Sequence, residues 1–404
     1  MPNIAQGVSK ILAYKKQSGL GSAASGSGGQ DLRRTSSTIN LNKDAYQSAE
    51  IRSDQQIADY RHGPKQVTGS IAGELSAGTY KDFLGSVLRK DFVAVTSLTS
   101  AAVTIVASTG VITFQTGNPL TAGIKIGMVA RITAGAVAAA NLNKNLLVIG
   151  VTATTLTVKT LNGSALADNS TSVTGVTIAV PGKISYTPES GQSNDYYTVE
   201  HWFSDITQSE VFTDVAFTNA QVSIPATGLS TITFPLVGLD MATGTSQVLT
   251  TPTAASTGGA FAGANGLLYV NGSAVAVITS IDFDINGNVA AADAVVGSNA
   301  RPDIFQGTLA VTGNMTIYFV DATFRDYFVN ETEVSVNVAL TTSSSNTADF
   351  VSIIMSRVKV GGADVTDGAN GLTRTFPFTA LKNTAGGAAL ANYATTIMFQ
   401  DSLA

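Results

Sequence analysis

A repeat within the chain constrains its fold more than any other feature of the sequence. Residues 67–84, VTGSIAGELSAGTYKDFL, align without a gap with residues 311–328, VTGNMTIYFVDATFRDYF. The constant offset, 311 − 67 = 244, keeps Val-Thr-Gly in register and matches Thr-Tyr-Lys-Asp-Phe-Leu with Thr-Phe-Arg-Asp-Tyr-Phe. Because apolar, basic and acidic character is preserved along the run, we predict that the chain contains an internal duplication.

The repeat extends on both sides of this run. Residues 38–42, TINLN, alternate apolar and polar side chains as a strand does, and residues 282–286, DFDIN, repeat the alternation at the same offset. Further along, the Phe-Pro pair ending at Pro235 matches the pair ending at Pro377, at the smaller offset 377 − 235 = 142. The offset falls by 244 − 142 = 102 residues, which indicates that the second copy lacks a segment of this size.

The segment without a counterpart, residues 98–183, contains short β-branched runs separated by turn residues, as in a small sandwich or barrel. Residues 17–30 are rich in Gly and Ser, which is typical of a flexible segment. We therefore predict a flexible N-terminal arm (1–34), a discontinuous first copy (35–97 and 184–243), an inserted β-domain on the outer surface (98–183), a linker (244–278) and a second copy (279–404).

The clearest helical pattern lies in residues 77–92. Its apolar side chains recur at helical spacing along a single stripe, and Ser76 or Thr79 is a candidate N-cap. The second copy has a shorter version of the stripe. We predict a mainly β fold with two tandem β-sandwich or barrel domains, each with one flanking helix, and the small β-domain inserted in the first.

Composition excludes several classes of function. Charged residues make up only 13% of the chain, which suits a surface that becomes buried in an assembly, and the net charge of −5 argues against binding by phosphate neutralisation. Without cysteine there is no disulfide, thiolate nucleophile or Cys-ligated metal. The first residues lack a secretory signal pattern, and no apolar run is long enough to span a membrane. These features predict a soluble protein made in a cytoplasm, without a membrane partner.

Catalytic and metal motifs are weak. The two histidines, His62 and His201, belong to no zinc-protease signature, and the sequence has no Gly-x-Ser-x-Gly elbow. Asp54, Asp59 and His62 share the most charged segment, which we interpret as a solvated or intersubunit loop because a catalytic site also needs an orienting partner and a pocket.

Residues 364–370, DVTDGAN, have acidic and amide side chains whose spacing misses the EF-hand pattern, so we interpret them as a turn. We therefore predict no enzymatic activity, no cofactor and no metal.

The chain resembles the major tail tube proteins of long-tailed, siphovirus-type bacteriophages, in an internally duplicated form. The resemblance rests on LAYKKQSGLG (12–21), SAEIRSD (48–54), Arg-His-Gly (61–63) leading into the repeated run, and residues 197–200 and 212–238. It implies a β-sandwich or barrel with a flanking helix, whose inward sheets join around a ring. Stacked rings of this kind make a hollow tube through which phage DNA passes.

The resemblance also implies partners and contacts. Because many relatives form hexameric rings from single copies, two copies per chain imply a trimer with pseudo-sixfold symmetry. Implied partners are further copies of the chain, the tape measure protein and DNA in the lumen without specific binding, and the tail terminator and distal tail proteins, with assembly in the host cytoplasm. Candidate intersubunit or inter-ring contacts are Leu12, Tyr14, Lys15, Lys16, Glu50, Arg52, Asp54, Asp59, Tyr60, Arg61 and His62.

Asp282, Asp284 and Glu200 are candidate acidic residues of the lumen. An alternative function is a surface-displayed β-sandwich adhesin or receptor-binding virion protein. It accounts for the composition and for the inserted domain, but it gives no reason for the duplicated unit or for the arm.

Overall fold

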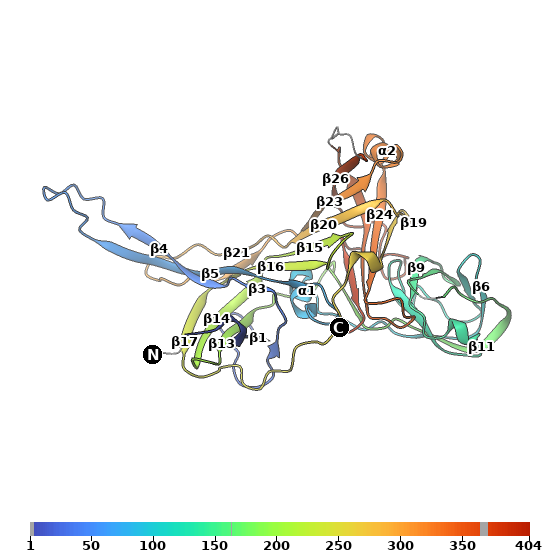
Figure 1. Cartoon of the computed structure of the whole chain (residues 1–404), viewed down its shortest axis with the longest axis horizontal. Coiled ribbons are helices and arrows are strands. Elements are labelled where there is room, and N and C mark those ends of the chain that lie inside the picture. Colours follow the sequence, from blue (N-terminus) through green and yellow to red (C-terminus); the bar gives the residue numbers. More distant parts are fainter. Residues whose placement is uncertain (1–3, 163, 364–370) are drawn as a thin grey trace.

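The computed structural model describes residues 4–162, 164–363 and 371–404. The fold is mainly β, with two short α-helices and a small closed barrel beside a large sheet system (Figure 1). Two parts of the chain are given names for reference. The first unit comprises residues 35–97 and 184–243, and the second unit comprises residues 279–404.

One continuous antiparallel sheet crosses both units. Its strands follow in spatial order, each pairing with the next: β4 (Asn40–Gln47), β5 (Tyr60–Glu74), β16 (Thr231–Gly238), β15 (Asn219–Pro225), β20 (Ile278–Asn286), β23 (Ala310–Tyr318) and β26 (Thr373–Ala380). The short β3 (Ser36–Ser37) also pairs with β5. The units meet where β15 pairs with β20 over seven residues, from Asn219↔Asn286 to Pro225↔Ser280. We call this sheet the central sheet.

A second layer of strands packs on one face of the central sheet. Over the central-sheet strands of the first unit, this layer contains β1 (Lys10–Lys16), β2 (Gln30–Asp31), β13 (Tyr197–Phe203), β14 (Gln208–Phe217) and β17 (Asp240–Gly244). Over the central-sheet strands of the second unit, it contains β12 (Lys183–Tyr186), β18 (Gly266–Val270), β19 (Ser273–Ala274), β24 (Glu333–Thr341), β25 (Phe350–Val360) and β27 (Met398–Asp401). A single apolar core lies between the layers and includes residues of both units, among them Ile71, Phe234, Met315 and Phe376.

The strands of the two units pair in the same register at the offsets seen in the sequence. Ile71 pairs with Phe234 in the first unit and Met315 pairs with Phe376 in the second, where 315 − 71 = 244 and 376 − 234 = 142. Asn40↔Thr68 and Asp284↔Thr312 likewise differ by 244 on both sides. The strand pairings at these positions therefore correspond between the two units.

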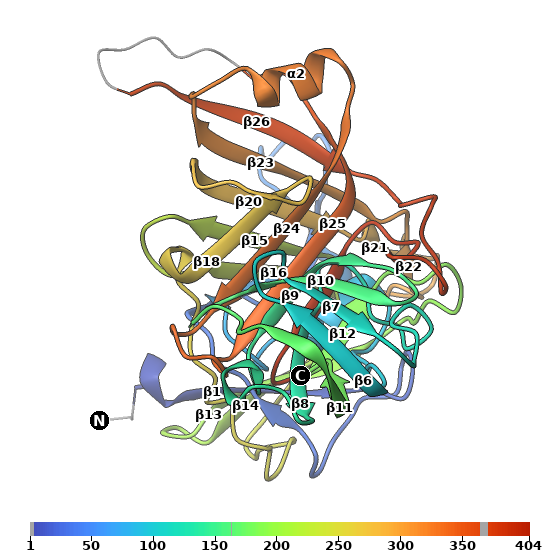
Figure 2. The same cartoon turned by 90° about the vertical axis from the view of Figure 1, so that its right-hand side faces the viewer.

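Six strands within residues 98–179 close into a barrel of their own, in the order β10-β7-β6-β11-β8-β9. They are β6 (Leu98–Val106), β7 (Val111–Phe114), β8 (Val129–Ala134), β9 (Leu146–Val151), β10 (Thr155–Thr160) and β11 (Asn169–Ala179), with the 3-10 turn η2 (Ala139–Asn141). The β-branched runs of the sequence occupy these strands, and their side chains fill the barrel core. Figure 2 shows the barrel in front of β24 and β25.

The barrel is fixed to the second unit, although it is inserted in the sequence of the first. Lys125 Nζ donates hydrogen bonds to the carbonyl oxygens of Gly387 (3.0 Å) and Ala388 (2.8 Å). The buried Gln400 side chain accepts from Val129 N (2.7 Å) and donates to Val129 O (3.0 Å). These bonds satisfy buried polar groups on both sides, so the contact holds a defined geometry.

The N-terminal region differs from the expected arm. Residues 10–16 form β1, which pairs with β13 from Lys10↔Phe203 to Lys16↔Tyr197, and the following segment is held where Gly21 N donates to Asp214 (2.6 Å). The expected linker likewise contains β18, which pairs with β24, and the 3-10 turn η3 (Gly263–Asn265). In both places a short apolar run covers the edge of a second-layer strand that would otherwise be open.

The helices are shorter than the apolar stripes predict. α1 (Lys81–Leu88) begins after Tyr80, and the hydroxyls of Ser76 and Thr79 bond each other (2.7 Å) instead of capping the helix. It ends at Arg89, whose φ of 63° is left-handed. α1 is buried, whereas α2 (Thr323–Val329) leaves apolar side chains exposed.

Candidate assembly surfaces and polar sheet face

The central sheet has one apolar face and one polar face, because side chains alternate along each strand. The polar side chains that point away from the core include Thr68, Ser70, Asn219, Gln221, Ser223, Thr231, Thr233, Asp282, Asp284, Thr312, Asn314, Thr316, Thr375 and Thr379. A hollow of ≈650 Å³ lies over this face. Among these outward positions, all within the described residues, there is no lysine or arginine, and the cation nearest in register is Lys359 of β25, which pairs with Thr379 at the edge of the face.

Asp282 and Asp284, two of the three candidate lumen residues, lie on this polar face. Asp282 accepts a hydrogen bond from Ser223, and Asp284 accepts two from Asn219 Nδ2 (2.9 and 3.1 Å). Partial burial raises the pKa of Asp284 above its ordinary value, although the Asn219 bonds oppose the shift. The face is thus weakly acidic and otherwise neutral.

The third candidate, Glu200, lies elsewhere. Its carboxylate is fully buried and accepts hydrogen bonds from Ser209 Oγ (2.6 Å) and from the backbone N–H groups of Val248 and Leu249 (both 2.7 Å). A buried carboxylate with this set of donors ties the chain after β17 to the second layer. The proposal of Glu200 as a lumen residue is therefore wrong.

A long hairpin formed by β4 and β5 projects from the body of the molecule (Figure 1). Its tip carries Glu50, Arg52, Asp54 and Asp59, followed by Tyr60, Arg61 and His62 at the start of β5, and all of these side chains are exposed. Arg52 bonds Asp54 (3.0 Å), which lowers the pKa of that carboxyl, and Arg61 pairs with Asp59 (2.9 Å). Exposed ion pairs of this kind contribute little to stability. Their charged groups can therefore exchange partners when the hairpin contacts another chain.

The tip also exposes two apolar side chains that were not among the candidate contact residues. Ile51 and Ile57 extend into solvent, although isoleucine is usually buried. Their position within the most charged segment of the chain was visible in the sequence. Apolar side chains at the end of a projecting hairpin indicate a contact surface.

A second hairpin, formed by β21 (Val289–Ala291) and β22 (Ile304–Gln306), runs beside the first one (Figure 1). Lys65 N donates to Asn299 O (3.0 Å) between the two hairpins. At its base, Arg89 Nη2 donates to the carbonyl oxygens of Gly287 (2.8 Å) and Gly307 (2.6 Å). Unlike the first hairpin, the second is therefore anchored against the first unit of its own chain.

The N-terminal contact candidates lie apart from the hairpin and make bonds within the chain. Leu12 and Tyr14 are buried in the core, where Tyr14 donates to Asp82 (2.7 Å). Lys16 pairs with Asp91 and Asp195. In this structure they stabilise the chain itself, because β1 has become a strand of the second layer.

Lys15 is held in the same way, since it donates to the carbonyl oxygens of Ser25 (2.8 Å) and Ser27 (2.6 Å). Its ammonium therefore fixes the Gly/Ser-rich segment that follows β1. All four N-terminal candidates thus have partners within their own chain.

One serine–histidine–carboxylate grouping occurs near β1. Ser37 Oγ lies 2.9 Å from His201 Nε2, and Glu210 Oε2 lies 3.7 Å from His201 Nδ1. Burial, with Lys10 and Arg34 nearby, lowers the pKa of His201 to about 3. A histidine with so low a pKa is a weak base at neutral pH, so the grouping does not fit general-base catalysis.

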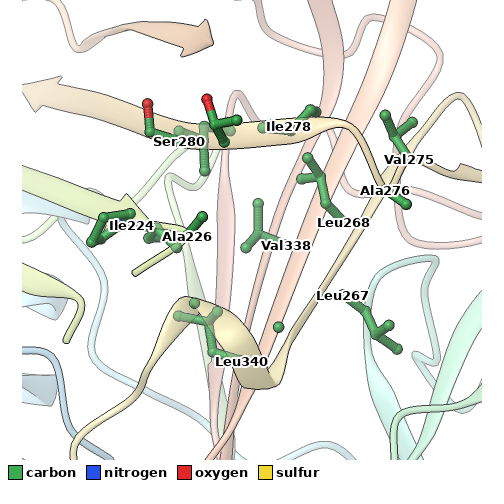
Figure 3. A pocket seen from close by; sticks show the side chains of 15 residues that line it. Ile224, Ala226, Leu267, Leu268, Val275, Ala276, Ile278, Ser280, Val338 and Leu340 are labelled. Carbon is green, nitrogen blue, oxygen red and sulfur yellow. The ribbon is translucent and has the colours of Figure 1, made fainter. Parts of the chain in front are cut away.

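Other chemical sites are not evident in the part of the chain that the structure describes. It contains no cluster of His, Asp and Glu that could hold a metal, and none of its helices is long and apolar enough to cross a membrane. The turn expected from the sequence at Asp364, Asp367 and Asn370 falls on residues outside the described part of the chain. An apolar pocket of ≈220 Å³ lies where the units join, and its lining, including Ile224, Leu268 and Val338, has no ionisable side chain (Figure 3).

Comparison with known proteins agrees with this architecture. The model of the phage tail tube protein family matches residues 7–380, nearly the whole chain. No curated protein gives a significant match. Proteins of this family are structural components of the virion tail that assemble into a tube, which agrees with a polar sheet face and projecting hairpins. The chain belongs to the phage tail tube protein family.

Proposed function

We propose that this protein is an internally duplicated tail tube protein of a siphovirus-type phage, and that it polymerises as stacked homotrimeric rings. The β15–β20 pairing carries the proposal, because it joins two units of matching register into one sheet. Three chains would place six such units around an axis, the number that single-copy relatives use.

The end strands of the central sheet, β4 and β26, give the ring its means of closure. An exposed sheet edge is a template for pairing with another chain, and closure into a ring removes it. Rotation of one chain onto the next by a third of a turn would bring β4 of one chain toward β26 of another. The internal β15–β20 pairing shows that strands of two units can join edge to edge in one sheet.

The polar face of the central sheet would then line the lumen. Thr, Ser, Asn and Gln side chains with Asp282 and Asp284 offer no cation to hold phosphate groups. DNA binding depends on phosphate neutralisation by Lys and Arg, so a duplex would pass along this surface without being retained. The tape measure protein would occupy the same lumen before DNA is delivered.

The hairpin tip, residues 48–59, would contact the next ring through its charged side chains and its exposed isoleucines. The inserted barrel would lie on the outer surface, since it packs on β25 and β27 of the second layer, away from the polar face. Tail terminator and distal tail proteins would cover the two ends of the stack, with assembly in the host cytoplasm.

Electron microscopy of the purified full chain tests the proposal. We expect hollow polymers or rings with threefold symmetry and six similar densities around the lumen. A stable monomer that binds a glycan would instead support a surface-displayed adhesin or receptor-binding virion protein. Rings with sixfold symmetry of whole chains would contradict the role given to the duplication.

A further inference from the structure

We propose that Tyr60 of one chain packs into a hollow between α2 and β25 of a second copy. The hollow, of ≈540 Å³, is lined by Tyr327, Phe328, Val329, Glu331, Thr332, Lys359 and Val360. This inference rests on the proposed assembly into rings. It names both surfaces of the contact between chains.

The template for the contact lies inside each chain. Ile304, at the loop end of the β21–β22 ladder, is only 3% exposed because it packs against Ala216, Val237 and Leu239 of the first unit. Arg89, at the end of α1, holds the base of the same hairpin through two carbonyl oxygens. One unit therefore receives the hairpin of the next unit beside its helix.

Tyr60 occupies the position of Ile304 in the first hairpin. The offset is 304 − 60 = 244, and the pairs Gln47↔Tyr60 and Ala291↔Ile304 have the same register. Yet Tyr60 is 57% exposed, whereas Ile304 is buried. Tyr60 of the first hairpin thus occupies the contact position, but no unit of its own chain packs against it.

The surface of the second unit that would contact Tyr60 is found by comparing strand pairings in the two units. In the first unit, Ala216 under Ile304 pairs with Val237; in the second, Lys359 pairs with Thr379, where 379 − 237 = 142. Lys359 lines the hollow beside α2. The position that is covered in the first unit is therefore open in the second.

Exposure of the two helices agrees with this assignment. The apolar side chains of α1 are buried, whereas Phe328 and Val329 of α2 are 46% and 65% exposed at the edge of the hollow. An aromatic ring suits such a half-apolar surface, because it buries a large area and its hydroxyl can remain at the rim.

Both surfaces carry one charge of each sign. Arg61, which follows Tyr60, pairs with Asp59 (2.9 Å), and Glu331 at the rim of the hollow pairs with Lys359 (3.6 Å). All four side chains are largely exposed, so in the contact Arg61 would face Glu331 and Asp59 would face Lys359, an arrangement that avoids like charges.

Cross-linking tests the contact directly, because the chain has no cysteine. The double variant Tyr60→Cys with Val329→Cys, purified as the full chain and mildly oxidised, should form disulfides between chains. We expect covalent dimers and trimers on a non-reducing gel that disappear on reduction.

A matched control uses Phe305, which is 61% exposed and adjoins Ile304 in the anchored hairpin. Phe305→Cys with Val329→Cys should give no covalent trimer. Equal products from the two pairs, or none from the Tyr60 pair while wild-type rings form, would overturn the contact and leave the tube function standing. Absence of wild-type rings would overturn the function and the contact together.

A second variant measures assembly. Tyr60→Glu should lower the fraction of chains in rings at least tenfold by sedimentation, with unchanged thermal unfolding of the monomer, whereas Phe305→Glu should leave the fraction unchanged. Assembly of Tyr60→Glu at the wild-type level would contradict the proposal.

Discussion

Two glycines show at the residue scale why the Val-Thr-Gly motif is repeated. A Cβ at Gly69 would lie 2.6 Å from Ile39 Cα and 2.7 Å from Thr38 O. A Cβ at Gly313, 244 residues later, would lie 2.4 Å from Asp282 O. In both units the neighbouring strand crosses too closely for any side chain, so the repeat preserves backbone contact.

Replacement of Gly69 by alanine should therefore destabilise the chain. The Cβ would meet backbone atoms that cannot move aside, and its φ of +152° disfavours a side chain, so we expect a loss of about 1–3 kcal/mol or more. The free energy of unfolding in denaturant measures the effect. Gly19→Ala, where nothing lies within 4 Å, is the control, and an equal loss there would contradict the explanation.

His201 gives the fold an acid-sensitive position. Its pKa in the folded chain is about 3, below the ordinary 6.5. Above pH 6.5 the histidine is neutral in the folded and in the unfolded chain, so it does not reduce the free energy of unfolding. Between pH 6.5 and 3 the unfolded chain gains a proton that the folded chain does not, which costs ~5 kcal/mol. His201→Gln should flatten the unfolding free energy over this range. An unchanged pH profile would contradict the buried neutral state.

At the scale of elements, the Lys125 side chain fixes the barrel to the second unit. Its ammonium has three carbonyl partners, at Gly387, Ala388 and Leu390, and the side chain is almost fully buried. Lys125→Met should lower the free energy of unfolding by about 2–4 kcal/mol, because buried carbonyl groups lose their donors. The exposed Lys159→Met serves as the control in the same denaturation experiment.

The hairpin tip, residues 48–59, should contribute to stacking of rings, whereas Tyr60 should contribute to contacts within a ring. Replacement of residues 48–59 by Asn-Gly keeps the β4–β5 ladder, since this dipeptide favours a two-residue turn. We expect unchanged thermal unfolding and intact rings that no longer stack, as counted by electron microscopy. The same dipeptide at residues 108–109 in the barrel should leave stacking intact. Formation of long tubes by the tip variant would contradict a role of the tip in contacts between rings.

For the whole molecule, the lack of lysine and arginine among the described outward positions of the central sheet predicts passage of DNA without retention. Gln221→Lys with Thr312→Lys would place basic groups on this face, and tubes of this variant should bind duplex DNA with an affinity that falls steeply with salt. Ser108→Lys with Thr109→Lys adds the same charge to the barrel. Gel retardation that is equal for both variants would show that the polar face does not line the lumen.

The sequence by itself determined the parts of the fold that depend on local pattern. The offsets of 244 and 142 are visible in the sequence, and the structure pairs Ile71 with Phe234 and Met315 with Phe376 at these offsets. The β-branched runs of residues 98–183 predicted short strands of a sandwich or barrel, and six strands in this segment form a closed barrel. Alternation along β20 also placed Asp282 and Asp284 on one face. These properties repeat with the period of a strand, so they can be read without knowledge of distant neighbours.

Only the tertiary structure decided which of these surfaces are covered. Residues 10–16 become a strand because β13 offers them an edge, and Glu200 is buried because the chain after β17 brings two N–H donors to it. Ile304 and Tyr60 occupy equivalent positions, yet only Ile304 has a neighbouring unit to pack against. Burial depends on contacts between segments far apart in the chain, and the local periodicity of the sequence does not predict these contacts.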